Sequence, residues 1–222
     1  MRSGVEILGP VVGLEHAVIL GPCVLGHPTS DDDEAPLELG RGVVIRAYAV
    51  LYRGAVLGDR VHVGHGALVR EGNVVGEDGS IGSGAHLEPH NHVGARTRVH
   101  SGCFLSSVTL GDDVFCGPRV VFTDDPHPPC PRYRDCVGGA VVGDGASIGA
   151  GTTMVPGVVI GARALVGAGS VVTRNVDPGD VVAGNPARRL GRRDELACYP
   201  GFFERAYAWE ATSAVVGVDG EA

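Results

Sequence analysis

The sequence predicts an all-β chain wound into a triangular prism of parallel strands. Two observations predict it: an aliphatic residue returns every six positions, and a small or β-branched residue usually follows it four positions later. Glycine supplies 36 of the 222 residues, against a usual share of about 7%, and it falls at regular places in this repeat. A helix is excluded because its period of about 3.6 residues does not keep every sixth residue on one face.

The repeat runs from Leu39 to Val172, with one gap after Phe122. Of its 21 aliphatic positions, 18 are Leu, Ile or Val, and glycine follows directly after 12. We expect these side chains to point inward and to stack on one another, while glycine occupies corners that need unusual backbone angles. Three units make a coil of about 18 residues, so the repeat predicts about seven triangular coils with strands about 4.8 Å apart.

Composition divides the chain into three parts. We expect N-terminal coils and an acidic loop in residues 1–38, the repeat prism in 39–177 with an external loop at 123–141, and a C-terminal segment in 178–222. Part of residues 192–211 is expected to form a short helix. Its apolar face would pack on the prism or on a neighbouring chain, because four residues fall at helical spacing: Phe202, Phe203, Ala206 and Trp209.

Charge and composition exclude several function classes. The formal net charge is −8, and all 18 basic residues are Arg, so we expect no nucleic-acid partner. A chain without Lys cannot form a Schiff base or a Walker A phosphate site. No apolar run reaches the length of about 20 residues that spans a membrane, and the first residues do not resemble a signal peptide. Six cysteines without a CxxC pair favour a reducing, cytoplasmic compartment.

Several segments carry a resemblance to a known family. The chain resembles the hexapeptide-repeat acyltransferases, and the match covers about residues 39–190. It is carried by the segment GASIGAGTTMVPGVVIGARALVGAGSVVTRNV and the following VVAGNPAR. VTLGDDVFCGPRVVFTDDPHP is similar to the branch that acetylates nucleotide-linked amino sugars. The resemblance implies a left-handed parallel β-helix, a homotrimer, and acyl transfer from acetyl-CoA to an amino sugar or related small amine. A nucleotide-linked amino sugar is one candidate acceptor.

The resemblance also implies a place for the donor. In the family, pantetheine lies along the outer corners of the C-terminal coils, and the matching residues are Gly149, Ala150, Gly151, Gly167 and Ala168, with Asn185 and Pro186 of the GNPAR segment. Four cations follow closely on this segment, and guanidinium groups suit the phosphates of coenzyme A: Arg188, Arg189, Arg192 and Arg193. The alternative is a solvated basic patch.

The loop at 123–141 is the strongest candidate for the acceptor site, because functional residues gather on loops carried by a rigid scaffold. It contains Asp124 and His127, which could hold an amine and accept its proton. His90 lies two coils below the start of the loop, and His100 lies on an adjoining side of the prism where a neighbouring chain's loop could reach it. These four residues are the candidate catalytic groups.

Other functions stay open at this stage. O-acetylation of a sugar or small alcohol needs a base to activate the hydroxyl. VHVGHGALVREG is similar to γ-carbonic anhydrases, but Arg70 stands where that family's site needs a second His. Cys130 and Cys136 could bind zinc together with His127, although a structural zinc site needs a fourth ligand. A prism without catalytic activity is the last alternative.

Overall fold

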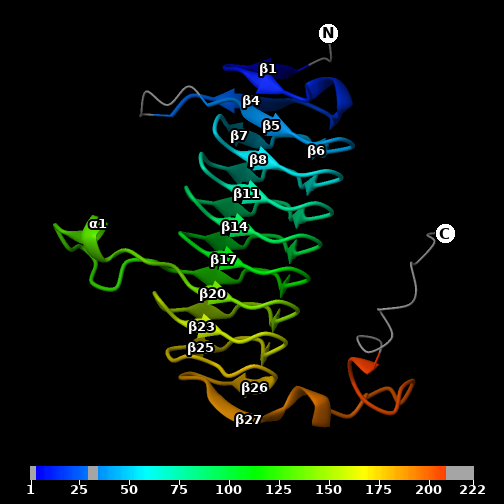
Figure 1. Ribbon diagram of the computed structural model, residues 1–222, viewed down its shortest axis with the longest axis vertical. Helices are drawn as coiled ribbons and strands as arrows, with labels where there is room; N and C mark the ends of the chain where they lie inside the picture. Colours follow the sequence, from blue (N-terminus) through cyan, green and yellow to red (C-terminus); the bar gives the residue numbers. More distant parts are fainter. Residues whose placement is uncertain (1–3, 30–34, 209–222) are drawn as a thin grey trace.

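The computed structural model describes residues 4–29 and 35–208 as a parallel β-helix with three flat faces (Figure 1). From β1 to β22, each strand pairs with the strand three places on in the sequence, so the chain visits the three faces in turn. We name the faces A, B and C. Face A contains β1 (Val5–Ile7), β4 (Cys23–His27), β7 (Val50–Tyr52), β10 (Leu68–Val69), β13 (His86–Leu87), β16 (Phe104–Leu105), β19 (Val121–Phe122), β22 (Thr153–Met154) and β25 (Val171–Val172).

Face B contains β2 (Val11–Val12), β5 (Leu37–Leu39), β8 (Val56–Leu57), β11 (Val74–Val75), β14 (His92–Val93), β17 (Thr109–Leu110), β20 (Val141–Val142) and β23 (Val159–Ile160), extended by a bridge from Ile160 to Val176. Face C contains β3 (Val18–Leu20), β6 (Val44–Arg46), β9 (His62–Val63), β12 (Ser80–Ile81), β15 (Arg98–Val99), β18 (Phe115–Cys116), β21 (Ser147–Ile148), β24 (Leu165–Val166) and β26 (Asp180–Ala183). The antiparallel strand β27 (Arg188–Arg192) closes this face.

The predicted all-β parallel helix is confirmed, and the coil count is corrected from seven to nine. Nine strands stack on face A, and faces B and C reach the same number through the Val176 bridge and β26. The additional coils come mainly from residues 5–27. These residues depart from the six-residue period, yet their strands pair in register with the next coil, as Cys23 does with Val5.

The predicted inward positions form the core. All 21 aliphatic positions of the repeat are buried, and none exposes more than 6% of its surface. Most small residues that follow them four positions later are equally buried, as Ala49, Ala67 and Ala164 illustrate. The register of 18 residues places Leu51, Val69 and Leu87 directly above one another. One continuous column of apolar side chains therefore fills the prism.

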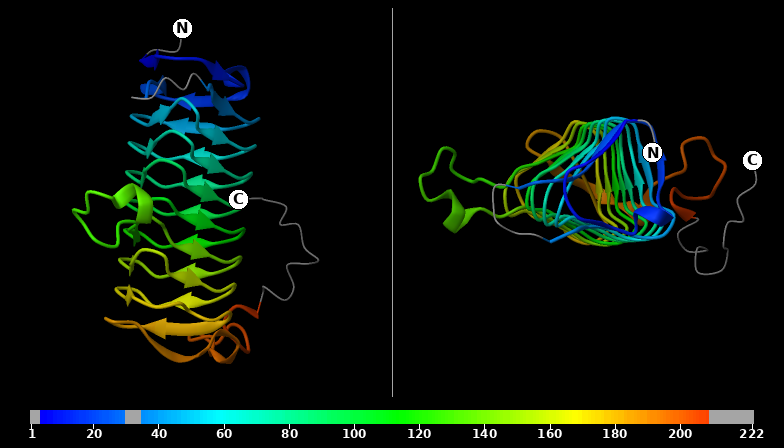
Figure 2. Two further views of the ribbon diagram at one scale, coloured as in Figure 1. Left: turned by 60° about the vertical axis from the view of Figure 1, so that its left-hand side comes forward. Right: turned by 90° about the horizontal axis from the view of Figure 1, so that it is seen from above.

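Three edges join the faces, and each has its own character. Both long insertions leave from the edge between faces A and B, the AB edge: one between β4 and β5, the other between β19 and β20. The second insertion extends away from the prism and carries the short helix α1 (Tyr133–Cys136) (Figures 1 and 2). The first is the acidic loop, of which residues 30–34 lie outside the described residues.

Two buried amides support the AB edge beneath the second insertion. Asn73 and Asn91 occupy the small-residue position of their units and are almost completely buried. Asn91 Nδ2 donates to Asn73 Oδ1 at 2.9 Å and to the carbonyl of Glu88 at 2.6 Å, and its Oδ1 accepts from the backbone N–H of Val108 at 2.8 Å. The two side chains thus link three successive coils through groups that would otherwise be buried without partners.

The C-terminal segment differs from the expectation of a helix. The 3₁₀ helix η2 (Arg193–Glu195) is its longest helical stretch within the described part, and Trp209 lies outside that part. Phe202 is 83% exposed and Phe203 is 49% exposed, so neither ring is buried. The other 3₁₀ helix, η1 (Leu14–His16), lies in the first coil.

No helix among the described residues is long and apolar enough to cross a membrane.

Replacing Asn91 by Ala is expected to destabilise the prism. The substitution leaves the Val108 N–H and the side-chain Oδ1 of Asn73 without their partner inside the core, and each such loss costs about 1–3 kcal/mol. Urea unfolding of the variant should therefore give a free energy of unfolding lower by about 2–6 kcal/mol. His92→Ala, at the exposed neighbouring position, should change it by less than about 0.5 kcal/mol. Equal effects of the two substitutions would contradict this role for Asn91.

Candidate functional site

The loop at 123–141 leaves the prism through a tightly bonded neck. Asp124 Oδ2 accepts a hydrogen bond from Ser106 Oγ at 2.7 Å and another from Ser107 Oγ at 3.1 Å. The Asp124 carbonyl accepts from the N–H of Gly138 at 2.9 Å, so the outgoing and returning strands of the loop are joined. Gly139 passes so close to the Ser106–Ser107 backbone that a Cβ there would overlap it.

Ser106 and Ser107 are functional candidates that sequence reasoning did not single out. They lie in the step between Leu105 and Leu110, which is one residue shorter than the repeat. Ser107 adopts a positive φ of 56°, which turns this shortened corner toward the neck of the loop. The broken period was the available signal. It marked the corner where the prism is built to receive Asp124.

His127 lies in the part of the loop that extends away from the prism. Its side chain is exposed, and its backbone N–H donates to Asp125 Oδ1 at 2.9 Å. Cys130 and Cys136 are also in this part. The pKa of the Cys136 thiol is raised, first by desolvation and then by the nearby Cys130 and Asp125. Within residues 4–29 and 35–208, no three His, Cys, Asp or Glu side chains come together to hold a metal ion, so the zinc hypothesis gains no support.

The other two histidine candidates lie apart from the loop tip. His90 sits on the AB edge in a left-handed conformation, with φ of 64°. Its ring covers Gly72 in the preceding coil, where a Cβ would collide with it. The ring therefore points toward the N-terminal end, away from the loop. His100 lies where face C turns into face A, and its ring centroid is 4.7 Å from that of Phe115.

The predicted donor residues line up on the edge between faces C and A, the CA edge. The N–H of Gly151 donates to the carbonyl of Pro118, and the N–H of Gly169 donates to the carbonyl of Ala150, so successive corners stack. Gly151 and Gly169 have φ of 67° and 70°, and a Cβ at either position would meet no atom within 4 Å. Ala150 and Ala168 are exposed beside them. This part of the edge is open to solvent and free of large side chains.

Asn185 and Pro186 continue the same edge at its C-terminal end. Gly184 N–H donates to Ser170 Oγ at 3.2 Å, and its carbonyl accepts from Val171 at 2.9 Å, which fixes the turn on the last regular coil. Asn185 and Pro186 are exposed. The predicted pantetheine corners and the GNPAR segment are thus brought together along one edge.

The four arginines that follow have different environments. Arg188 is exposed, and its guanidinium bonds the adjacent Ala187 carbonyl. Arg189 and Arg192 both donate to the carboxylate of Asp180, at 2.7 and 3.1 Å. Arg193 is buried and donates to backbone carbonyls of two coils. The expected cluster of four phosphate-binding cations is therefore divided: Arg188 bonds a backbone carbonyl, whereas Arg189 bonds a carboxylate.

Asp180 holds two of these arginines, Arg189 and Arg192, in place. Burial of its side chain favours the neutral acid, but the hydrogen bonds from Arg189 and Arg192 favour the carboxylate more strongly and hold its pKa below the ordinary value. The carboxylate remains charged at neutral pH and ties β27 to β26. The predicted contact of Arg189 with a coenzyme phosphate stays a prediction.

Comparisons with known proteins agree with this architecture. Residues 139–174 match the family model described as bacterial transferase hexapeptide (six repeats). A hexapeptide-repeat acetyltransferase from Vibrio cholerae, solved with acetyl coenzyme A, is 30% identical; the alignment covers 55% of this chain and 70% of that one, with a TM-score of 0.49. The chain belongs to the hexapeptide-repeat acyltransferases.

Two further structures place this acyltransferase among its relatives. A galactoside acetyltransferase solved with coenzyme A is 27% identical, with 56% of this chain and 68% of that chain covered and a TM-score of 0.50. UDP-N-acetylglucosamine acyltransferase from Campylobacter jejuni shares the fold over 88% of this chain and 80% of its own, at 18% identity and a TM-score of 0.63. No curated protein sequence is similar enough to count as a match.

The neck of the acyltransferase loop depends on Asp124, so Asp124→Ala is expected to loosen the loop. Trypsin should then cut after the exposed Arg132 on the order of tenfold faster, because cleavage follows local opening. Asp124→Asn keeps an oxygen that accepts from the serine hydroxyls and should restore much of the protection. Asp177→Ala, an exposed carboxylate outside the loop, is the control. Equal cleavage of the Ala variant and the wild type would refute the anchoring role.

Proposed function

We propose that this acyltransferase moves an acetyl group from acetyl-CoA to the amine of an amino sugar or a related small molecule. The observation that carries the proposal is the open, stacked run of corners at Gly151 and Gly169, which leads to the exposed GNPAR turn. An extended chain such as pantetheine can lie close to backbone along such an edge, since glycine has no side chain to hold it off. Two of the similar structures were solved with acetyl coenzyme A or coenzyme A.

The reaction itself makes modest demands on the protein. The amine nitrogen attacks the thioester carbonyl carbon, a C–N bond forms, the C–S bond breaks, and coenzyme A leaves as the thiol. The nitrogen must first lose the proton of its ammonium form and a second proton after attack. Alignment of the two reactants supplies much of the rate gain, because it replaces a bimolecular encounter by a reaction between held groups.

Asp124 is suited to hold the acceptor. Both serine hydroxyls donate to its Oδ2, and the residue is half-buried at the neck. Its second oxygen, Oδ1, can therefore accept a hydrogen bond from an ammonium group. A charge-assisted bond of this kind is about twice as strong as one between neutral groups. His127, exposed on the loop, is the proposed proton acceptor, with His90 and His100 as the remaining candidates.

Transfer to a hydroxyl is the second candidate function. The similarity to a galactoside acetyltransferase favours it, since that relative acts on a galactoside. A hydroxyl must be deprotonated as it attacks, so a general base would contribute about 10²–10⁴-fold. A free amine is already nucleophilic and needs less help. The two functions therefore differ in how much activity His127→Ala would remove.

The two halves of the proposed site lie on different edges of one prism. Asp124 and the loop belong to the AB edge, whereas Gly151 and Gly169 belong to the CA edge, and the loop extends away from its own chain (Figure 2). A second copy that places its CA edge beside this loop would complete the site. We propose a homotrimer in which each site is shared between neighbouring chains, a closed symmetric arrangement.

Ala168→Glu tests the donor edge. The new side chain would place bulk and negative charge on the proposed pantetheine track, so calorimetry should show coenzyme A binding at least about tenfold weaker. The exposed position predicts an unchanged thermal unfolding temperature. Ser83→Glu introduces the same group on the same edge in an earlier coil and should leave the affinity unchanged. If Ala168→Glu bound coenzyme A with wild-type affinity, this part of the CA edge would be excluded as the donor site.

Mixing two inactive variants tests the shared site. Replacing residues 126–136 by a short Gly-Ser linker should preserve the prism and coenzyme A binding but abolish transfer. Ala168→Glu should lose transfer for want of the donor. Random trimers formed from equal amounts of both would pair an intact loop with an intact donor edge at about a quarter of their sites, so about a quarter of the wild-type activity should return. No recovery, in mixtures shown by mass to contain both chains, would rule out sharing.

A further inference from the structure

The C-terminal segment closes a hollow on the edge between faces B and C, the BC edge. Arg193 Nη1 donates to the carbonyls of Gly145 at 2.8 Å and Arg163 at 3.2 Å, which belong to two successive coils. Its guanidinium carbon lies 3.8 Å from the centroid of the Tyr207 ring. The N–H of Ala206 donates to the carbonyl of Leu196 at 2.8 Å. These contacts hold the segment firmly against the coils.

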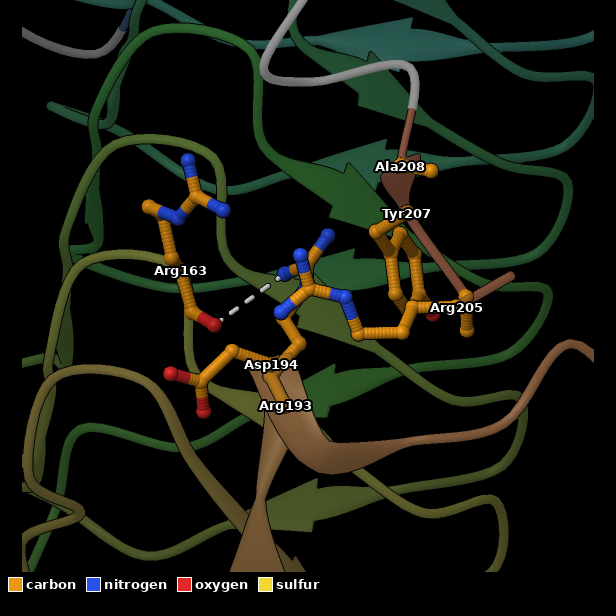
Figure 3. Close-up of a pocket in the computed structure, with 7 residues that line it drawn as sticks. Arg163, Arg193, Asp194, Arg205, Tyr207 and Ala208 are labelled. Carbon is orange, nitrogen blue, oxygen red and sulfur yellow. Dashed lines mark hydrogen bonds between the residues drawn. The ribbon is translucent and has the colours of Figure 1, made fainter. Parts of the chain in front are cut away.

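The hollow formed in this way is lined by arginine. One part, of about 160 Å³, is bordered by Arg163, Arg193, Asp194, Arg205 and Tyr207. Figure 3 shows Arg163 on the side of the coils, Arg205 and Tyr207 on the side of the C-terminal segment, and Arg193 and Asp194 between them. An adjoining part, of about 400 Å³, shares Arg163, Arg193 and Asp194 and adds Arg192.

The charge of this hollow is opposite to that of the chain. Four guanidinium groups face one lining carboxylate, Asp194, on a protein whose formal net charge is −8. Arginine stays protonated at every physiological pH, so the group cannot relieve its mutual repulsion by losing protons. Arg192 donates to Asp180 and has its Nε 3.8 Å from Asp194 Oδ1. Arg163 and Arg205 reach the hollow from exposed positions. An anion placed among them would offset the repulsion.

Guanidinium donors select the kind of anion. Arginine offers several N–H groups in a planar fork and accepts no hydrogen bond, so its best partner is an oxyanion with several acceptor oxygens. Gly179, on the wall of the second part, allows Arg192 to lie close: a Cβ there would come within 2.8 Å of Arg192 Nη2. The first part of the hollow, with its volume of about 160 Å³, suits a phosphoryl group better than a whole nucleotide.

We propose that this hollow is a binding site for a phosphoryl or pyrophosphoryl group, distinct from the donor edge. Its wall residues Ala162 and Arg163 lie at the corner between faces B and C, whereas the donor residues Gly149–Gly151 and Gly167–Gly169 lie at the corner between faces C and A. The bound group stabilises the C-terminal segment on the prism, since it joins Arg205 of the segment to Arg163 of the coils.

Calorimetry with inorganic pyrophosphate at constant ionic strength tests the site. The wild type should bind it, and the double substitution Arg163→Gln with Arg205→Gln should weaken binding by at least about tenfold, as loss of charged hydrogen bonds predicts. Arg193 remains in both proteins, so the segment stays fastened, and an unchanged thermal unfolding temperature without ligand verifies this. Arg98→Gln, an exposed arginine on face C, is the matched control and should bind like the wild type.

A second pair of ligands identifies the source of the phosphate. If the double variant loses affinity for coenzyme A but not for dephospho-coenzyme A, the site receives the coenzyme's 3′-phosphate. If both are bound as by the wild type while pyrophosphate is not, the ligand is a separate phosphate compound. Wild-type pyrophosphate affinity in the double variant, or none in the wild type, would overturn the proposal. Neither result would contradict the proposed donor site on the CA edge, which Ala168→Glu tests independently.

Discussion

The register of 18 residues between successive coils is the constraint on which the rest of the structure depends. It puts each inward aliphatic residue on the one before, as Leu51, Val69 and Leu87 show. It also brings every strand beside the next at the spacing that parallel hydrogen bonding needs. A change in unit length must be absorbed at a corner, because the strands on either side remain bound to their neighbours. Corners are consequently where this chain differs from one coil to the next.

The three edges show how differently those corners are used. On the BC edge, charged residues occupy several left-handed positions and pair across coils, as Arg60 does with Asp78 and Arg96 with Asp113. The hydrogen bond from Arg60 lowers the pKa of Asp78, which keeps the ladder charged. On the AB edge, the corners are interrupted by insertions and supported from within by Asn73 and Asn91. The exposed ion pairs of the BC edge contribute little stability each, so their main effect is to order the BC edge.

Much of the prism could be predicted from the sequence because the period is local and repeats many times. Each inward residue is fixed by its distance from the previous one, and no knowledge of distant contacts is needed. The first coils were not counted because residues 5–27 lack that period, although Val5 and Cys23 still pair. The helix expected near Phe202 does not form, although the helical spacing that predicted it is present. Arg193 and the BC edge determine the path of the segment instead.

The candidate site was accessible to sequence reasoning only where a motif or a break in the period marked it. Asp124 and the donor corners fell in such places. Ser106 and Ser107 were marked by a missing residue whose meaning required the neck to be seen. The arginine hollow had a partial sequence signal, since Arg192 and Arg193 follow the GNPAR segment. Arg163 and Arg205 belong to other stretches of the chain and meet them only in the folded molecule.

The CA edge differs from the BC edge in a way that steric crowding does not explain. Both have left-handed corners, but Gly66, Gly84, Gly151 and Gly169 stand on the CA edge where a Cβ would meet no atom within 4 Å. A side chain there would cost about 1–2 kcal/mol of backbone strain, and the BC edge accepts that cost at Arg60 and Asp78. Glycine at these four corners therefore relieves strain and leaves the backbone bare there, although Tyr48 and Arg119 occupy the left-handed position at two other corners of the edge. A ligand or a neighbouring chain can lie against the backbone at such bare corners, whereas paired side chains cover the corners at Arg60, Asp78 and Arg96 on the BC edge.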